Sequence, residues 1–170
     1  MKKILIVFII YFSIFGCSDS VSPENEGVIY SNSFEKESDF EGWEGISSEN
    51  WKDDVPNKES KKSVFISGGC VQPHALYVFK NNLLQGYYTI ESWGKAYGHT
   101  VGGAVSLVYQ KDENYYYSSV SLRFSDSVWV YKISDTLFFD KSSNLRIEMS
   151  AGGIFASAML IDNIIVKKIK

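Results

Sequence analysis

The chain has few of the residues on which most catalytic and metal sites depend. Its 170 residues include two histidines, two cysteines and three prolines. His74 and His99 lie far apart and form no His-x-x-x-His pair, and the sequence holds neither a Gly-x-Ser-x-Gly motif nor a glycine-rich phosphate loop. Carboxylates are plentiful, but no pattern singles out a glycosidase pair. We therefore expect a protein that is not an enzyme.

Clusters of positive charge are also absent. The formal net charge is −3, and lysine and arginine are scattered along the chain. Nucleic-acid binding needs a basic footprint for the phosphates, so this composition argues against a nucleic-acid partner. Anionic polymers are poor candidates on the same ground.

No apolar run is long enough to span a membrane as a helix. The longest early run, residues 4–15, has 12 residues and follows Lys2 and Lys3, whereas a spanning helix needs about 20. This pattern is typical of a signal peptide over residues 1–16. The run ends in Ile14-Phe15-Gly16-Cys17, which resembles the bacterial lipobox apart from the bulky Phe15. We expect Cys17 to be lipidated; the alternative is an ordinary secretory signal with a chance thiol.

Residues 17–27 form a polar stretch that we interpret as a flexible tether. Processing before Cys17 leaves 154 of the 170 residues and removes two lysines, which takes the net charge from −3 to −5. In bacterial lipoproteins, an Asp after the lipidated cysteine often retains the protein at the inner membrane, and this chain has Ser18 there. We therefore expect a membrane-anchored lipoprotein of the bacterial cell envelope, at the outer membrane or the cell surface. Cys70 is then the only other cysteine, expected to be buried and without a disulfide.

Residues 28–170 make up one domain in which nearly every segment reads as a strand. No stretch of a dozen residues keeps a helical period, and Gly, Asn, Asp and Ser fill the turns. Short strands at regular spacing predict an all-β fold, a two-sheet antiparallel β-sandwich of the jelly-roll type. The predicted strands are 28–35, 63–67, 75–79, 87–95, 103–110, 115–124, 128–133, 136–139, 145–150 and 154–166, and the longest expected loop is 43–62.

The segment Ala158–Val166 has seven apolar residues of nine and one central carboxylate, Asp162. A continuous apolar run of this length predicts a strand buried on both faces, central in its sheet. An ionised carboxylate in that setting is costly unless a cation or several donors meet it. We therefore expect a metal ion at Asp162.

Alternation along the other strands assigns their two faces. Tyr88 and Ile90, for example, should point into the core. If these strands share one sheet, its outer surface carries aromatic, hydroxylic and charged side chains suited to a ligand. The candidate ligand-binding residues on that surface are Trp93, Tyr115, Tyr117, Glu91, Gln110 and Arg123, beside Lys95, Arg146 and Glu148.

The order of several motifs resembles the carbohydrate-binding modules with a galactose-binding-domain-like jelly roll. The resemblance covers residues 28–170, with a missing glycine before Ser33 and an insertion after Trp43 as departures. The motifs are Ser31-Asn32-Ser33-Phe34-Glu35, Phe40-Glu41-Gly42-Trp43, Tyr88-Thr89-Ile90 through Lys95-Ala96, Trp129 through Phe138, Leu145-Arg146-Ile147 and Leu160-Ile161-Asp162-Asn163-Ile164.

This resemblance implies a structural calcium ion held by Glu35 and Asp162, with backbone carbonyls near Ser33 as further oxygen ligands. The alternative is that Asp162 accepts hydrogen bonds from neighbouring amides and binds no ion. The resemblance also places Trp43 and Trp129 in the core.

The predicted function is non-catalytic binding of a polysaccharide or oligosaccharide. Sugar rings present apolar faces rimmed by hydroxyls, so a binding surface needs flat aromatic rings together with amide and charged groups. The alternative is a structural or protein-binding surface lipoprotein with no glycan ligand, using the same aromatic face against other envelope proteins.

Overall fold

The structure is a computed structural model that describes residues 27–70, 72–80, 83–110, 117–140, 144–152 and 157–169. The predicted signal peptide, Cys17 and Tyr115 lie outside these residues. Among the described residues, no helix has both the length and the apolar character needed to cross a membrane.

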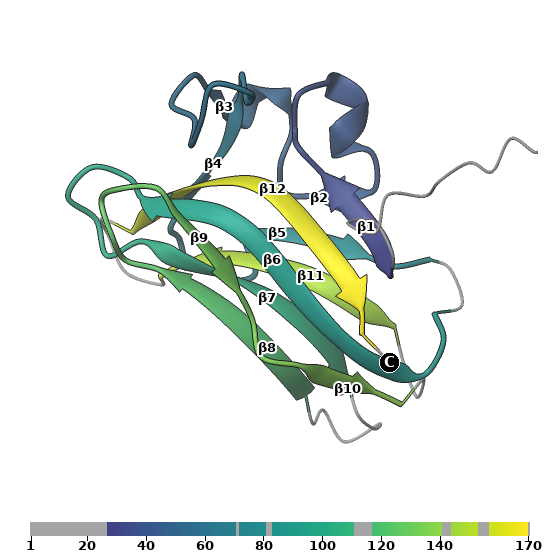
Figure 1. Ribbon diagram of the computed structural model, residues 1–170. Coiled ribbons are helices and arrows are strands. Elements are labelled where there is room, and N and C mark those ends of the chain that lie inside the picture. The colour runs from purple at the N-terminus through teal and green to yellow at the C-terminus, as the bar shows by residue number, and fades with distance from the viewer. Residues whose placement is uncertain are drawn as a thin grey trace, which may run out of the picture.

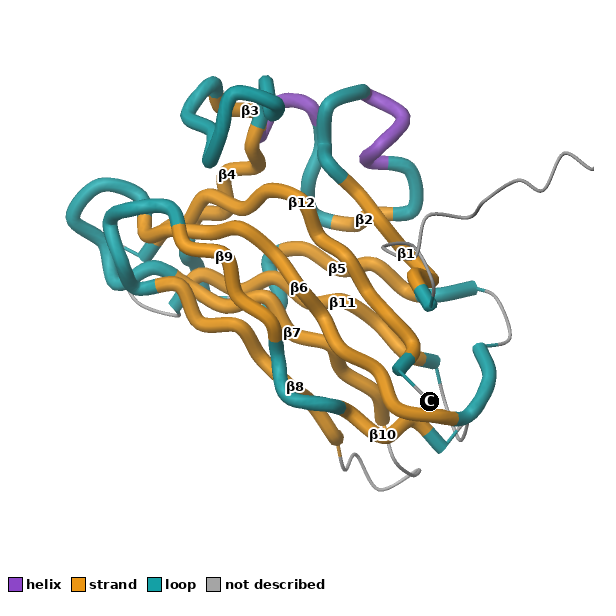
Figure 2. The backbone as a smooth tube through the Cα atoms, in the orientation of Figure 1, coloured by secondary structure: helices purple, strands orange, loops and turns teal. Residues whose placement is uncertain are grey.

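Two antiparallel sheets stacked face to face make up the domain (Figure 1). The seven-stranded sheet contains β1 (Val28–Asn32), β3 (Trp51–Lys52), β4 (Ser63–Ser67), β6 (Gly86–Ala96), β9 (Val130–Ile133), β10 (Leu137–Phe139) and β12 (Ala158–Lys168). The five-stranded sheet has the order β2 (Trp43–Glu44), β5 (Ala75–Val78), β11 (Leu145–Ala151), β7 (Gly103–Gln110) and β8 (Tyr117–Phe124). Two 3-10 helices, η2 (Glu37–Phe40) and η3 (Ser48–Asn50), lie near β3 at one end of the sandwich (Figure 2).

The predicted all-β sandwich is confirmed, and most strands lie within a few residues of their expected bounds. The long loop expected over residues 43–62 instead contains two strands of two residues each, β2 and β3. The central position expected for β12 is confirmed, since it pairs with β6 on one side and with β4 and β1 on the other.

The core lies between the sheets and is made of the inward-facing residues of both. Ile90 and Ile161 from one sheet and Leu107 and Ile147 from the other are fully buried in one cluster, and Tyr88 is also buried, as alternation predicts. The sheets approach so closely that a Cβ on Gly94 would lie 2.6 Å from the ring of Phe124. Glycine is therefore required at this point of β6.

The strands expected to share one ligand-binding surface belong to different sheets. β6, with Glu91 and Trp93, lies in the seven-stranded sheet, whereas β7 and β8, with Gln110, Tyr117 and Arg123, lie in the five-stranded sheet. Because the outer faces of a sandwich point away from each other, Glu91 and Trp93 cannot share a site with Tyr117 and Arg123. The expectation of a single shared surface was wrong.

Two further expectations about burial were also wrong. Cys70 is exposed, in the turn after β4. Trp129 is only half-buried and lies outside the core, where its indole Nε1 donates to Asp54 Oδ1 at 2.9 Å and Lys95 Nζ lies 5.4 Å from its ring centroid. Trp43, by contrast, is in the core as expected.

Candidate functional site

A groove crosses the outer face of the five-stranded sheet, over β11, β7 and β8. It consists of two adjoining hollows of about 570 Å³ and 370 Å³, which share Gln72, Ser106, Glu148 and Ser150 as lining residues. The groove is open because the strands beneath it carry small side chains there. Ser106 on β7 and Ser121 on β8 face each other there, with their hydroxyl oxygens 2.8 Å apart.

One end of the groove combines an aromatic ring with a matched ion pair. The guanidinium carbon of Arg146 lies 5.0 Å from the ring centroid of Tyr117, and Arg146 Nε lies 2.6 Å from Glu148 Oε1. Tyr117 remains about half exposed. The half-exposed ring can stack on the apolar face of a sugar, and the guanidinium and carboxylate groups beside it can form hydrogen bonds with sugar hydroxyls.

The other end of the groove is lined by Arg123, Ser125 and glycines 102, 103 and 152. Arg123 follows Ser119 and Ser121 on the outward parity of β8, and its side chain is exposed. Gly102 has a positive φ of 72°, and a Cβ there would collide with the carbonyl oxygen of Phe124. Glycine is therefore required at this point of the groove lining.

The outer face of the other sheet holds Glu91 and Trp93 in internal contacts. Glu91 is buried, accepts a hydrogen bond from the Tyr131 hydroxyl and lies 2.8 Å from Lys167 Nζ. Burial raises the pKa of Tyr131 well above its usual range, and the hydrogen bond to Glu91 raises it further. The ring of Trp93 lies 5.3 Å from that of Tyr131. The Glu91 carboxylate is therefore occupied by contacts with Tyr131 and Lys167 within its own sheet.

The structure brings Tyr117 and Arg123 into the groove and places Glu91 and Trp93 on the opposite face. Gln110 pairs with Tyr117 in the β7–β8 ladder, and the position of its side chain is not described. Gln72 is a groove residue that sequence reasoning missed, because it precedes β5 and no alternation pattern applies to it. Arg146 and Glu148, which alternation predicts to face outward beside the candidate residues, also line the groove.

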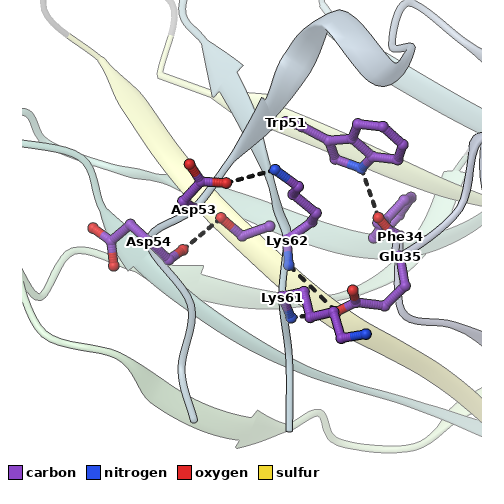
Figure 3. A network of polar contacts seen from close by, with 8 residues as sticks. Phe34, Glu35, Trp51, Asp53, Asp54, Lys61 and Lys62 are labelled. Carbon is purple, nitrogen blue, oxygen red and sulfur yellow. Dashed lines mark hydrogen bonds and ion pairs between the residues drawn. The ribbon is translucent and has the colours of Figure 1, made fainter. Parts of the chain in front are cut away.

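Glu35 and Asp162 form a second polar cluster, where the segment after β1 meets β12. Asp162 is fully buried, and neither of its carboxylate oxygens accepts a hydrogen bond. Glu35 Oε1 accepts from the backbone amide of Lys61 at 2.7 Å (Figure 3), while Oε2 is buried without a partner. Three buried carboxylate oxygens are thus left without donors, which is costly unless a cation meets them.

Burial raises the pKa of Asp162 to about 6, and the nearby charge of Glu35 adds to the rise. Ser60 and the backbone amide of Asn163 offset part of it, but neither completes a hydrogen bond to the carboxylate oxygens. The pKa is that of a carboxyl group that lacks a compensating charge.

The backbone beside both carboxylates is strained. Phe34 and Asn163 have φ values of 55° and 53°, and they are the only non-glycine residues with positive φ among those described. This conformation is unusual for a bulky residue such as Phe34, which is held by a hydrogen bond from the indole of Trp51 to its carbonyl oxygen at 2.6 Å (Figure 3).

The donor set fits a hard divalent cation such as calcium, which prefers carboxylate and carbonyl oxygens. Glu35 and Asp162 would hold the ion, and no third acidic, histidine or cysteine side chain joins them within the described part of the chain. Backbone oxygens or water would complete the coordination. In this role the ion would neutralise the buried carboxylates and join β12 to the segment after β1.

Comparison with known proteins supports the fold. No protein-family model matches the chain, and no curated protein matches it in sequence. Among solved structures, the CBM22-1 xylan-binding domain of Paenibacillus barcinonensis Xyn10C is 19% identical with a TM-score of 0.57, over 85% of this chain and 97% of that one. The C-terminal family 22 carbohydrate-binding module of Clostridium thermocellum Xyn10B is 9% identical with a TM-score of 0.60, over 84% and 93%.

A third similar structure contains the CBM22-1 and GH10 modules of Clostridium thermocellum Xyn10B in complex with xylohexaose. It is 14% identical with a TM-score of 0.59, over 84% of this chain and 29% of that one. These likenesses confirm the jelly-roll fold of carbohydrate-binding modules that the sequence motifs predicted.

Proposed function

We propose that this protein binds a polysaccharide or oligosaccharide without catalysis, in the groove on the five-stranded sheet. The observation that carries the proposal is the combination of Tyr117, Arg146 and Glu148 at one end of an open groove lined by serine hydroxyls. The ring offers a stacking surface, and the charged groups and hydroxyls offer hydrogen bonds of both polarities. The fold is shared with xylan-binding modules, which supports a glycan as the ligand.

We also propose that the chain is attached to a membrane. Cys17, as a lipidated N-terminal residue, would anchor the domain through the tether of residues 17–27, at the outer membrane or the cell surface. A calcium ion between Glu35 and Asp162 would serve stability rather than binding, because these residues do not line the groove. The domain would then present its groove to glycans at the envelope.

A glycan array followed by affinity electrophoresis tests this function. The full-length chain in detergent should be retained by at least one soluble polysaccharide, and Tyr117→Ala should reduce the retention. Xylan is the first polymer to test. Absence of retention by every polymer on the array would contradict glycan binding.

A protein-binding role is the second candidate, favoured by one observation. Tyr87, Ile133 and Phe138 lie on the outer face of the seven-stranded sheet and are 45%, 60% and 40% exposed. Exposed apolar side chains that gather on one face mark many protein interfaces. Cross-linking in the envelope, with Ile133→Ser as a variant, would separate this role from glycan binding.

A further inference from the structure

The two arginines of the groove differ in how their charge is balanced. Arg146 is paired with Glu148 and lies over the ring of Tyr117. Arg123 takes part in no ion pair with any of the described residues. The groove residues Arg123, Arg146 and Glu148 therefore leave one positive charge, in a chain whose formal net charge is −3.

The surroundings of Arg123 favour a ligand anion over a structural role. The hollow beside it is lined mainly by small residues, among them glycines 102, 103 and 152 and serines 121 and 125. Val101 and Phe124 are its bulky apolar members, and its one acidic residue, Glu148, is already paired with Arg146. Lys132 adds to the positive charge at this edge, because its Nζ donates to the backbone carbonyl of Arg123 at 2.5 Å. A guanidinium group binds a carboxylate through two parallel hydrogen bonds, and a neutral hydroxyl more weakly.

We infer that the groove selects a glycan that carries uronic-acid carboxylates, with the main chain stacked on Tyr117 and a carboxylate held by Arg123. This inference rests on the proposed function and names the class of glycan. It departs from the expectation drawn from overall composition that anionic polymers are poor ligands, because the charge of the groove differs in sign from the charge of the chain.

Tyr117 and Arg123 are suitably placed for this division of roles. Both lie on the outward parity of β8, six residues apart, which corresponds to about 20 Å along a strand. A ligand that contacts both must therefore extend over several sugar residues. The carboxylate would be recognised as part of a polymer, because a single sugar is too short to reach the stacking ring.

The test compares one polymer in two forms by affinity electrophoresis of the full-length chain. The probes are a xylan with glucuronic-acid side groups and the same xylan after reduction of its carboxyl groups to alcohols. We expect the unreduced polymer to bind about tenfold more tightly at low salt, and the difference to shrink as salt rises. Arg123→Gln should abolish the difference while binding to the reduced polymer is kept.

Lys58→Gln is the matched control, because Lys58 is exposed outside the groove and its replacement changes the net charge equally. It should leave the preference intact. Equal binding of both polymers by the unsubstituted chain would overturn the uronic-acid inference and leave glycan binding standing. Binding of neither form, with retention by another polymer of the array, would also overturn the inference and leave glycan binding standing, whereas retention by no polymer would overturn both.

Discussion

The guanidinium group of Arg146 on β11 reaches across β7 to lie over the ring of Tyr117 on β8, with its carbon 5.0 Å from the ring centroid. Val108 of the intervening strand pairs with Arg146 in the ladder and is buried, although it faces outward. The arginine thus covers the strand between them and supports the ring from one side. The exposed part of the ring remains available to a ligand.

Replacement of Tyr117 by alanine should weaken glycan binding by about fivefold, because a stacked aromatic ring contributes on the order of 1 kcal/mol beyond simple contact. The ring is half exposed, so the melting temperature should stay near that of the unsubstituted chain. Tyr117→Phe should keep most of the affinity. Leu107→Ala, in the core, should instead cost about 2–5 kcal/mol of stability. Unaltered binding by Tyr117→Ala would exclude the groove as the site.

Trp93→Ala tests the opposite face. The Trp93 ring packs on Tyr131 in the seven-stranded sheet, so its loss should cost about 1–3 kcal/mol of stability and leave glycan affinity unchanged. Affinity electrophoresis and thermal melts on the same sample separate the two effects. If binding disappears while the domain stays folded, the glycan site lies on the Trp93 face.

Removal of calcium should lower the melting temperature. A ligand bound only by the folded state stabilises it by roughly 2.7 kcal/mol at a hundredfold excess over Kd, and Asp162 and Glu35 have three buried oxygens to offer. Thermal melts with calcium and with a chelator measure the difference. Asp162→Asn should remove the sensitivity to chelator. Identical curves under both conditions would show that no ion is bound.

In the presence of a chelator, the free energy of unfolding should depend on pH through the titration of Asp162. Its pKa is about 6 in the folded chain, above the usual value near 3.9, so the folded state holds the proton more tightly. The free energy of unfolding should therefore fall as the pH rises from about 4 to 6, by about 3 kcal/mol for this group. Denaturant unfolding of the unsubstituted chain and of Asp162→Asn, at each pH, isolates the contribution.

Asp53→Asn is the control for that comparison. A hydrogen bond from Lys62 lowers the pKa of Asp53, so its stabilising effect is lost as the pH falls, the opposite sign to Asp162. A difference between the unsubstituted chain and Asp162→Asn that stays constant from pH 4 to 7 would contradict a raised pKa.

Membrane attachment should depend on Cys17. Cys17→Ser should either release the chain from the membrane or leave it unprocessed, because an apolar run of 12 residues is too short to span. Membrane fractionation with an immunoblot for processed size measures both outcomes. Retention of the processed variant at the level of the unsubstituted chain would contradict lipid anchoring.

Much of the fold could be predicted because the signals are local. Side chains on a strand alternate between two faces, so the apolar parity of residues 87–95 and 103–110 identified the core positions directly. The apolar residues on either side of Asp162 likewise identified β12 as buried and central. The core positions and the place of β12 were confirmed by burial and pairing.

The candidate site could be predicted only in part, because alternation does not say which strands pair. Tyr117 and Trp93 have the same outward parity, yet they lie on opposite surfaces of the molecule. Trp129 lies outside the core and donates a hydrogen bond to Asp54, a contact between residues 75 positions apart. Neither outcome has a signal in the local sequence.

The sequence by itself determined the strands, their inward faces and the residue types available for binding, since these follow from side-chain period and turn chemistry. Only the tertiary structure decided which outward residues meet. Backbone pairing placed β7 between β8 and β11, which joined Tyr117, Arg146 and Glu148 in one groove, and pairing of β1 with β12 brought Glu35 to Asp162. Such pairing depends on hydrogen bonds between distant segments and on the closure of the loops that join them, which no single stretch of sequence encodes.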